Sequence, residues 1–388
     1  MLRALCLATI LLVLPLGHAS ADAPGDLGAN AALRYWQAFA TLPKFTDAEQ
    51  TKLMAEHLTM PLDAQARESV TKAEYSLRML HHGAVLSGCD WGIDWEADGI
   101  EVLLPQMTAA RVLSSLACLR ARFRFEEGRG AEAFDDLVAA MTLSRQISMD
   151  GSLIGVLVGY NIEARTTNAL ALYLPKLDPG TIKDLKKRLD ALPQGGNPTS
   201  GLLVCEAKTL EWFIHKVKSA KDKDSLVALL APLTRLSSQP EGKARDALEG
   251  GRALLNECGG TAAGVLKFAE ETRPSYVLTA KQMALPLAQF EKEFARETMR
   301  QAGNPVYKIF FPALVNVRRA QARTDVRRAL LSAAFAVQLD GPDALKNHPD
   351  PVADGSFEYS KFADGFELTS KFKQDDKPII LNVGQRGK

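Results

Sequence analysis

The chain has 388 residues, of which 46% are hydrophobic and 24% are charged, proportions typical of a globular protein with one large or two ordinary domains. Its 47 lysines and arginines are balanced by 46 aspartates and glutamates, which excludes an overall electrostatic bias towards nucleic acid or anionic membranes. Aromatic residues make up only 7% while alanine and leucine are abundant, so the composition favours helices over strands.

The first residues have the pattern of a secretory signal peptide. Arg3 is followed by an apolar run over 4–17, and the small residues Ala19–Ala21 provide a cleavage motif. The run is shorter than the ~20 residues that a membrane-spanning helix needs, and no comparable run occurs later. We therefore predict a signal peptide over 1–21 and an exported mature chain, periplasmic or extracellular, without a transmembrane segment.

Cysteine usage leaves two possibilities open for the mature chain. Cys6 lies inside the predicted signal peptide, so four cysteines remain. In an oxidising compartment these can pair in three ways, among which the spacing does not choose, and buried free thiols are the alternative. The spacing is wide and no C-x-x-C motif occurs, so there is no zinc signature. The four residues are Cys89, Cys118, Cys205 and Cys258.

The N-terminal helical region is predicted to cover 22–193, where apolar residues recur at helical spacing. Thr46 and Glu49 form a capping box that starts one helix. Asp63 is placed to cap the next helix, which extends to about His82. We expect the helices of this region to pack in pairs.

Two longer helices are predicted over 105–125 and 131–147, joined by Glu-Gly-Arg-Gly at 127–130. Small residues recur in both at helical spacing, which lets two helices approach closely. The pair resembles one tetratricopeptide-type hairpin, although no period of about 34 residues repeats cleanly elsewhere. Further helices follow over 152–174 and 178–192.

The breaker Pro-Gln-Gly-Gly-Asn-Pro at 193–198 is the best candidate for a domain boundary. Beyond it we predict a C-terminal helical region over 199–340. Its helices are expected over 201–218, 224–236, 242–258, 262–271, 274–300 with a kink at Pro286, and 304–338 with Pro312 inside it.

The pattern changes after the last helix. Segments 356–362 and 366–372 alternate aromatic and polar residues around Asp364–Gly365, a two-residue turn typical of a β-hairpin. A third apolar run at 378–381 is compatible with an edge strand. We therefore predict a mainly α fold, with helical hairpins in a bundle or irregular α-solenoid, that ends in a small antiparallel β-hairpin subdomain over 350–383.

Three stretches occur together in this chain: Cys-Asp-Trp-Gly at 89–92, the small-residue hairpin continuing into Gly-Tyr-Asn-Ile-Glu at 159–163, and Asn304–Pro305 with its Ala-rich helix and terminal hairpin. This combination is similar to a group of exported, mostly helical bacterial proteins of unknown function. The resemblance implies export and a helical body, and it implies no activity.

The segment 89–99, Cys-Asp-Trp-Gly-Ile-Asp-Trp-Glu-Ala-Asp-Gly, is the densest polar cluster of the chain. Asp94, Glu96 and Asp98 match the first ligand positions of an EF-hand loop, but the twelfth position is proline instead of glutamate. Calcium is therefore the one cofactor to consider, bound in another geometry. The alternative is a solvated acidic loop that caps the following helix, with Asp98 near its N-terminus.

The same loop is compatible with a sugar-acting site. Glycoside chemistry needs two carboxylates about 5–10 Å apart, and tryptophan faces offer apolar platforms to sugar rings. The candidate acids are Asp90, Asp94, Glu96 and Asp98, and the candidate ligand platforms are Trp91 and Trp95.

Two histidine patterns are better explained by structure than by catalysis. His81 and His82 end a helix, where their positive forms suit the helix dipole, and adjacent helical residues point apart. Glu211 and His215 lie one turn apart with Glu206 nearby, and without a second histidine they indicate a surface pair.

Arg319, Arg323 and Arg327 form a stripe on the last long helix, with Arg318 and Arg328 beside it. An anionic partner could use such a stripe. The alternative is the solvated face of an amphipathic helix.

No G-x-S-x-G, P-loop or dinucleotide-binding motif is present. We therefore expect an exported helical scaffold or interaction protein without intrinsic catalysis, which binds a protein or a cell-envelope component and no nucleic acid. The alternatives are a polysaccharide-acting hydrolase or lyase and a calcium-dependent binding protein, both using the loop 89–99.

Overall fold

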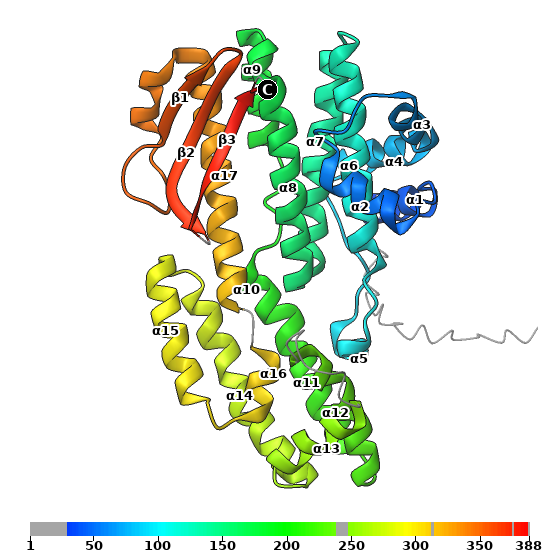
Figure 1. Ribbon diagram of the computed structural model, residues 1–388. Coiled ribbons are helices and arrows are strands. Elements are labelled where there is room, and N and C mark those ends of the chain that lie inside the picture. The colour runs from blue at the N-terminus through cyan, green and yellow to red at the C-terminus, as the bar shows by residue number, and fades with distance from the viewer. Residues whose placement is uncertain (1–28, 238–246, 312–313, 375, 387–388) are drawn as a thin grey trace, which may run out of the picture.

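The computed structural model describes residues 29–237, 247–311, 314–374 and 376–386. The predicted signal peptide 1–21 lies outside these ranges. The chain is mainly helical and ends in a small antiparallel sheet (Figure 1). The predicted fold class is therefore confirmed.

The N-terminal helices pack with α6 around one apolar core. They are α1 (Ala31–Ala40), α2 (Asp47–Glu56), α3 (Ala64–Lys72) and α4 (Glu74–Ala84). The predicted capping box is present, because the backbone N–H of Glu49 donates to Thr46 Oγ1 and that of Thr46 donates to Glu49 Oε2. Asp63 caps α3 as predicted, but the helix breaks at Ala73, so the single helix expected to reach His82 is two helices.

The long central helices match their predicted positions closely. They are α6 (Pro105–Glu126), α7 (Gly130–Ile147), α8 (Leu153–Tyr173) and α9 (Pro179–Asp190). Ser152 caps α8 by accepting a hydrogen bond from the Gly155 N–H at 2.8 Å. Helices α7 and α8 approach so closely at Gly159 that a Cβ there would lie 2.5 Å from the Ser144 carbonyl oxygen.

The linker after α9 is irregular and turns the chain towards the lower half of the molecule in Figure 1. The N–H of Gly196 in this linker donates to Ser148 Oγ at 2.8 Å, which holds it against the end of α7. The lower helices are α10 (Pro198–Gly201), the π-helical turn η5 (Leu202–Glu206), α11 (Ala207–Ser219), α12 (Lys223–Ser237), α13 (Ala247–Glu257), α14 (Ala262–Gln282), α15 (Leu287–Arg300) and α16 (Pro305–Phe310).

Proline was a poor guide to the helix ends in this region. The helix predicted to stop at 271 continues through Pro274 as α14, because an interior proline can be tolerated where packing holds the turn. The kink predicted at Pro286 is a full break, with Pro286 just before α15. The helix predicted from Asn304 divides into α16 and α17 (Leu314–Asp340), and Pro312 lies outside the described residues.

The C-terminal strands form a sheet in the order β1-β2-β3, with both pairs antiparallel. Phe362 pairs with Gly365, so the turn is Ala363–Asp364, one residue earlier than predicted. The possible third strand is present. The strands are β1 (Glu358–Phe362), β2 (Gly365–Gln374) and β3 (Lys377–Gly384), and short 3₁₀ turns occur at η2 (Gly99–Glu101), η3 (Ser148–Asp150), η4 (Leu174–Lys176) and η6 (Pro342–Asn347).

Helices α8 and α17 stand in the middle of the molecule, between α1–α4 on one flank and the sheet on the other (Figure 1). Leu330 in the second half of α17 shares a core with Leu368 and Val383 of the sheet. Val317 in the first half packs with the lower helices. The last helix of the predicted 199–340 region thus joins both halves, and the segment 350–383 shares its core with helices.

Candidate anion-binding groove

The acidic loop runs along the surface and ends in the short helix α5 (Trp95–Asp98), and all four of its candidate carboxylates are exposed. Asp94 Oδ1 accepts hydrogen bonds from two backbone N–H groups of α5 at 3.1 and 3.0 Å. Asp90 Oδ1 accepts one from the Gly92 N–H at 2.9 Å. Two of the four acids therefore stabilise local turns.

The structure corrects the capping role expected for Asp98. This residue ends α5, and α6 follows Leu104 with Pro105 at its first position and no side-chain cap. The expectation arose because an acidic residue shortly before an apolar run is typical of helix starts. The residue that does cap a helix is Asp94.

The two tryptophans of the loop lie in the core rather than on an open platform. Trp91 is 7% exposed, stacks on Tyr35 with ring centroids 6.0 Å apart, and donates from Nε1 to the Gln146 carbonyl oxygen at 2.9 Å. Trp95 is 6% exposed and donates from Nε1 to the Asp150 carbonyl oxygen at 3.0 Å. Both indoles anchor the loop to the helical body.

Within the described ranges, no group of three or more histidine, cysteine, aspartate or glutamate side chains could hold a metal ion. Calcium binding by Asp94, Glu96 and Asp98 stays a prediction, and so does the sugar-acting alternative. Glu96 and Ala97 of the loop line a hollow of the surface.

All four cysteines of the predicted mature chain are free thiols, three of them buried and Cys89 half-buried. Burial raises the pKa of the Cys89 thiol to about 12 and that of Cys258 to about 11. Of the two alternatives left open by the sequence, the structure therefore shows free thiols, and these four cysteines form no disulfide.

A hollow of about 550 Å³ between α5 and α11 brings Glu96 together with Glu211 and His215. Glu211 is an exposed surface residue as predicted, but its partner is Arg273, whose Nε and Nη2 donate to its carboxylate at 2.6 and 2.8 Å. Glu206 ends the π-helical turn, where burial raises the pKa of its carboxyl to about 7.

A second hollow, which we name the arginine groove, is formed by α6, α8 and α17 and has a volume of about 430 Å³. Its floor is apolar, because Tyr160 and Ala320 are buried in one small cluster with Leu157 packed against them. Its charged and amide side chains are Arg111, Asn161, Arg165, Asn168, Arg323 and Arg327.

The groove concentrates positive charge in a chain whose net charge is only +1. No aspartate or glutamate lines it, and within the described part of the chain none of its four arginines forms an ion pair. Arg111 Nε is buried without a hydrogen-bond partner there, and Arg165 reaches only Ser115 Oγ, at 3.4 Å. The guanidinium groups are therefore available to a ligand.

Burial and mutual repulsion act on the titration of these groups. Burial, together with the charge of Arg323, lowers the pKa of Arg327 to about 10. Burial and the charge of Arg111 lower the pKa of Arg165. Burial raises the pKa of the Tyr160 phenol to about 12. The groove therefore holds its guanidinium donors in an unfavourable concentration of positive charge.

The remaining arginines of the predicted stripe have partners elsewhere. Arg319 Nε donates to Glu291 Oε1 at 2.7 Å, and Arg328 donates from Nε and Nη2 to Glu163 at 2.7 and 2.9 Å. Arg318 Nη2 donates to a backbone carbonyl oxygen at 2.9 Å. The carboxylate of Glu163, which also binds Arg145, is thus occupied on the other side of α8.

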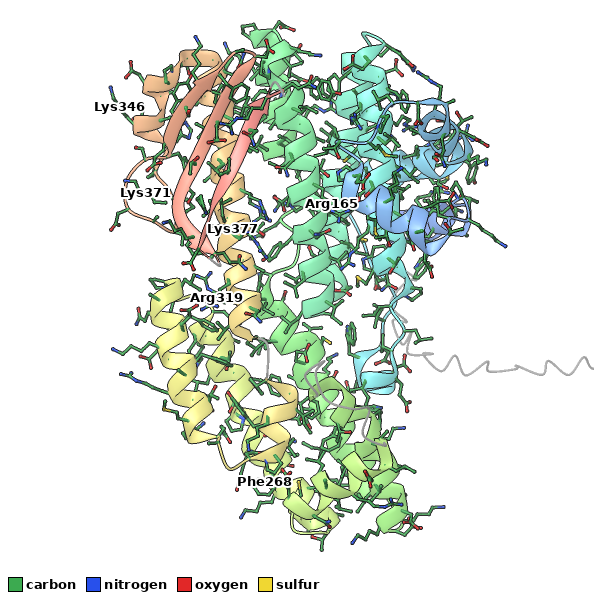
Figure 2. The ribbon with its side chains drawn as sticks, viewed as in Figure 1. Arg165, Phe268, Arg319, Lys346, Lys371 and Lys377 are labelled. Atoms are coloured by element: carbon green, nitrogen blue, oxygen red, sulfur yellow. The ribbon has the colours of Figure 1, made fainter. Side chains whose placement is uncertain are left out.

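Of the five arginines of the predicted stripe, Arg323 and Arg327 line the groove and the other three do not. Figure 2 shows Arg165 near the centre of the molecule and Arg319 at the lower end of α17. The solvated-face alternative does not describe Arg323 and Arg327, because both are half-buried.

Sequence reasoning missed Arg111 and Arg165, which complete the groove. Each is a lone arginine on a helix rich in apolar and small residues, α6 and α8. A charge on a mostly buried helix face needs a partner, so the absence of a suitably spaced acid was a usable signal. This signal does not predict that Arg111 and Arg165 lie beside α17.

No protein-family model, curated protein or solved structure matches this chain. Within the described residues, no single helix is both long and apolar enough to cross a bilayer, and Trp95–Glu101 with Pro105–Glu126 meets that criterion only as a pair bent by 81°. The similarity to exported helical proteins stays a resemblance, and a functional proposal depends on the geometry of the groove.

Proposed function

We propose that the protein is an exported helical scaffold, without intrinsic catalysis, that holds an anionic ligand in the arginine groove. Guanidinium groups match carboxylate and phosphate oxygens with paired, charge-assisted hydrogen bonds. The observation that carries the proposal is the meeting of four arginines in one hollow whose lining contains no carboxylate.

The side chains of the groove support binding rather than chemistry. Besides the arginines, they offer the amides of Asn161 and Asn168, which are hydrogen-bond donors. General acid–base catalysis uses groups that titrate near the working pH. The pKa of Arg327, about 10, and the pKa of Tyr160, about 12, both lie far above neutrality.

The free protein carries an energetic penalty at this site. Bringing like charges into a half-buried hollow without counterions disfavours the folded state. Binding groups in functional sites commonly reduce stability in this way. A bound anion would remove the penalty, which links ligand binding to stability.

Substitution of Arg327 tests the proposal. In the free protein Arg327→Gln is expected to raise the free energy of unfolding by ~1 to 2 kcal/mol, because it removes a charge that burial and Arg323 disfavour. Millimolar inorganic phosphate should then stabilise the wild type more than the variant. Urea unfolding with and without phosphate measures both effects.

Phosphate also stabilises proteins without specific binding, so a matched control is needed. Arg319→Gln removes an arginine from the same helix outside the groove, where it pairs with Glu291. This control should keep the full phosphate response. Equal phosphate responses in wild type and Arg327→Gln would contradict an anion site in the groove.

Export is tested separately, by sequencing the N-terminus of protein recovered from the cell envelope and the medium of the native host. Cleavage after the small-residue motif is expected to leave a chain that starts at Asp22. An intact Met1 on the recovered protein would contradict export and leave the proposal for the groove untouched.

A further inference from the structure

The four arginines of the groove belong to two sets. Arg111 comes from α6 and Arg165 from the adjacent α8, whereas Arg323 and Arg327 lie one turn apart on α17. We name these sets the α6–α8 wall and the α17 wall. The floor between them is apolar, with Tyr160 from α8 against an alanine of α17.

Repulsion acts within each wall. The charge of Arg111 contributes to lowering the pKa of Arg165, and the charge of Arg323 contributes to lowering that of Arg327. Neither pKa is affected by an arginine of the opposite wall. Helix α8 packs against both α6 and α17, so the groove has one pair of guanidinium groups on each of its two walls.

A single small anion can neutralise one such pair and leaves the other without a counterion. We propose, on the basis of the proposed function, that the ligand is a small molecule with at least two anionic groups, phosphate or carboxylate, which bridges the α6–α8 wall and the α17 wall. One anionic group pairs with Arg111 and Arg165, and the other pairs with Arg323 and Arg327.

The size of the groove favours a small molecule over a macromolecule. Its volume of about 430 Å³ lies within the ~300–1,000 Å³ that is usual for small-molecule sites. Asn161 and Asn168 are exposed along the α8 side of the groove, where their amides can bind neutral oxygens between the charged ends. No lysine lines the groove, so anion recognition depends on the forked geometry of arginine.

Calorimetric titration of the full chain at constant ionic strength tests the bridge. The phosphate series is inorganic phosphate, pyrophosphate and tripolyphosphate, and the carboxylate series is acetate, succinate and citrate. In at least one series, the second anionic group should increase affinity about tenfold or more, because it adds charge-assisted hydrogen bonds at the second wall. The series that shows the increase identifies the anionic group.

One variant from each wall locates the two contacts. Arg165→Gln and Arg323→Gln should each reduce the affinity for the preferred two-group anion about tenfold, and should reduce the affinity for the one-group anion by a smaller factor of about two to three. Arg319→Gln, whose arginine pairs outside the groove, should change neither affinity. Far-UV circular dichroism establishes that each variant is folded.

The outcomes separate this inference from the proposed function. Equal affinity for one-group and two-group anions in both series would overturn the bridge and leave the groove an anion site. A two-group anion that responds to only one of the two wall variants would also overturn the bridge. Failure of every anion to bind the wild type would overturn the proposed function itself.

Discussion

Asp136 shows at the residue scale how this helical body tolerates a buried charge. Its side chain is fully buried, yet it lies 2.7 Å from His81 Nε2 and accepts hydrogen bonds from Arg124 Nη1 at 2.7 Å and from Arg120 Nε at 3.0 Å. Burial raises the pKa of Asp136, but the hydrogen bonds and the two guanidinium charges outweigh it, and the pKa is below its usual value. His81, expected only to suit a helix end, is part of this network.

Asp136→Asn is expected to lower the free energy of unfolding by ~3–5 kcal/mol, because it leaves buried cations without their counterion. Asp135→Asn is the matched control, since Asp135 is half exposed and pairs with Arg188 at the surface, and it should cost less than about 1 kcal/mol. Urea unfolding of the two variants makes the comparison. Similar losses would show that the network contributes little.

The same carboxylate has a predicted pH dependence. Its folded pKa lies below the unfolded value, so its stabilising contribution is complete above the unfolded pKa of about 4 and is lost as the pH falls through the lower folded value. The wild type should therefore lose more stability than Asp136→Asn between pH 5 and the acid transition. Parallel pH profiles of the two proteins would contradict this assignment.

At the scale of elements, α5 acts as a short contact between the two halves of the molecule. Gly99 follows it with φ +54°, and a Cβ there would lie 2.2 Å from the Trp212 ring of α11. Trp95 fixes the other side of α5 by its hydrogen bond to the Asp150 carbonyl. A four-residue helix can hold its place here because both contacts are close.

Gly99→Ala should destabilise the protein by ~2–4 kcal/mol, because it combines a backbone conformation that alanine rarely adopts with a clash against Trp212. Gly92→Ala is the matched control. Gly92 also has positive φ, +68°, but open space around its Cβ position, so only the backbone strain of ~1 kcal/mol applies. Equal losses of stability in the two variants, measured by thermal and urea unfolding, would mean that the contact with α11 does not contribute to stability.

At the scale of the whole molecule, the small sheet is part of the helical body. Phe366, Leu368 and Val383 share one apolar core with the second half of α17 and with α8 residues such as Leu170. The sheet therefore covers an apolar face that α8 and α17 would otherwise expose. The segment predicted as a small hairpin subdomain thus packs against helices in the structure.

Leu368→Ala is expected to cost ~2–5 kcal/mol and to lower the melting temperature of the helices, because Leu368 is fully buried between sheet and helices. Ile380→Ala on the open face, where the side chain is 41% exposed, should cost less than about 1 kcal/mol. Far-UV circular dichroism follows the helical signal during thermal unfolding. Loss of the sheet alone, with unchanged melting of the helices, would contradict the shared core.

The sequence by itself determined the helical class, most helix starts and the β-hairpin. Thr46, Asp63, Ser152 and Asp178 cap the helices that follow them, because a capping side chain bonds to backbone groups only two or three residues away. Such contacts are local, so a short stretch of sequence is enough to predict them. Proline was less informative, because packing decides whether a helix continues through it, as at Pro274.

Only the tertiary structure decided which charges meet. Half of the groove was visible as an arginine stripe in one helix, but Arg111 and Arg165 come from distant segments that hydrophobic packing brings beside α17. The same packing buried Trp91 and Trp95 and left the four candidate acids of the loop exposed. The hydrophobic effect is non-directional and depends on the apolar area that is buried, so it brings together segments that are far apart in the sequence. The charged residues that meet in this way share no pattern in the local sequence.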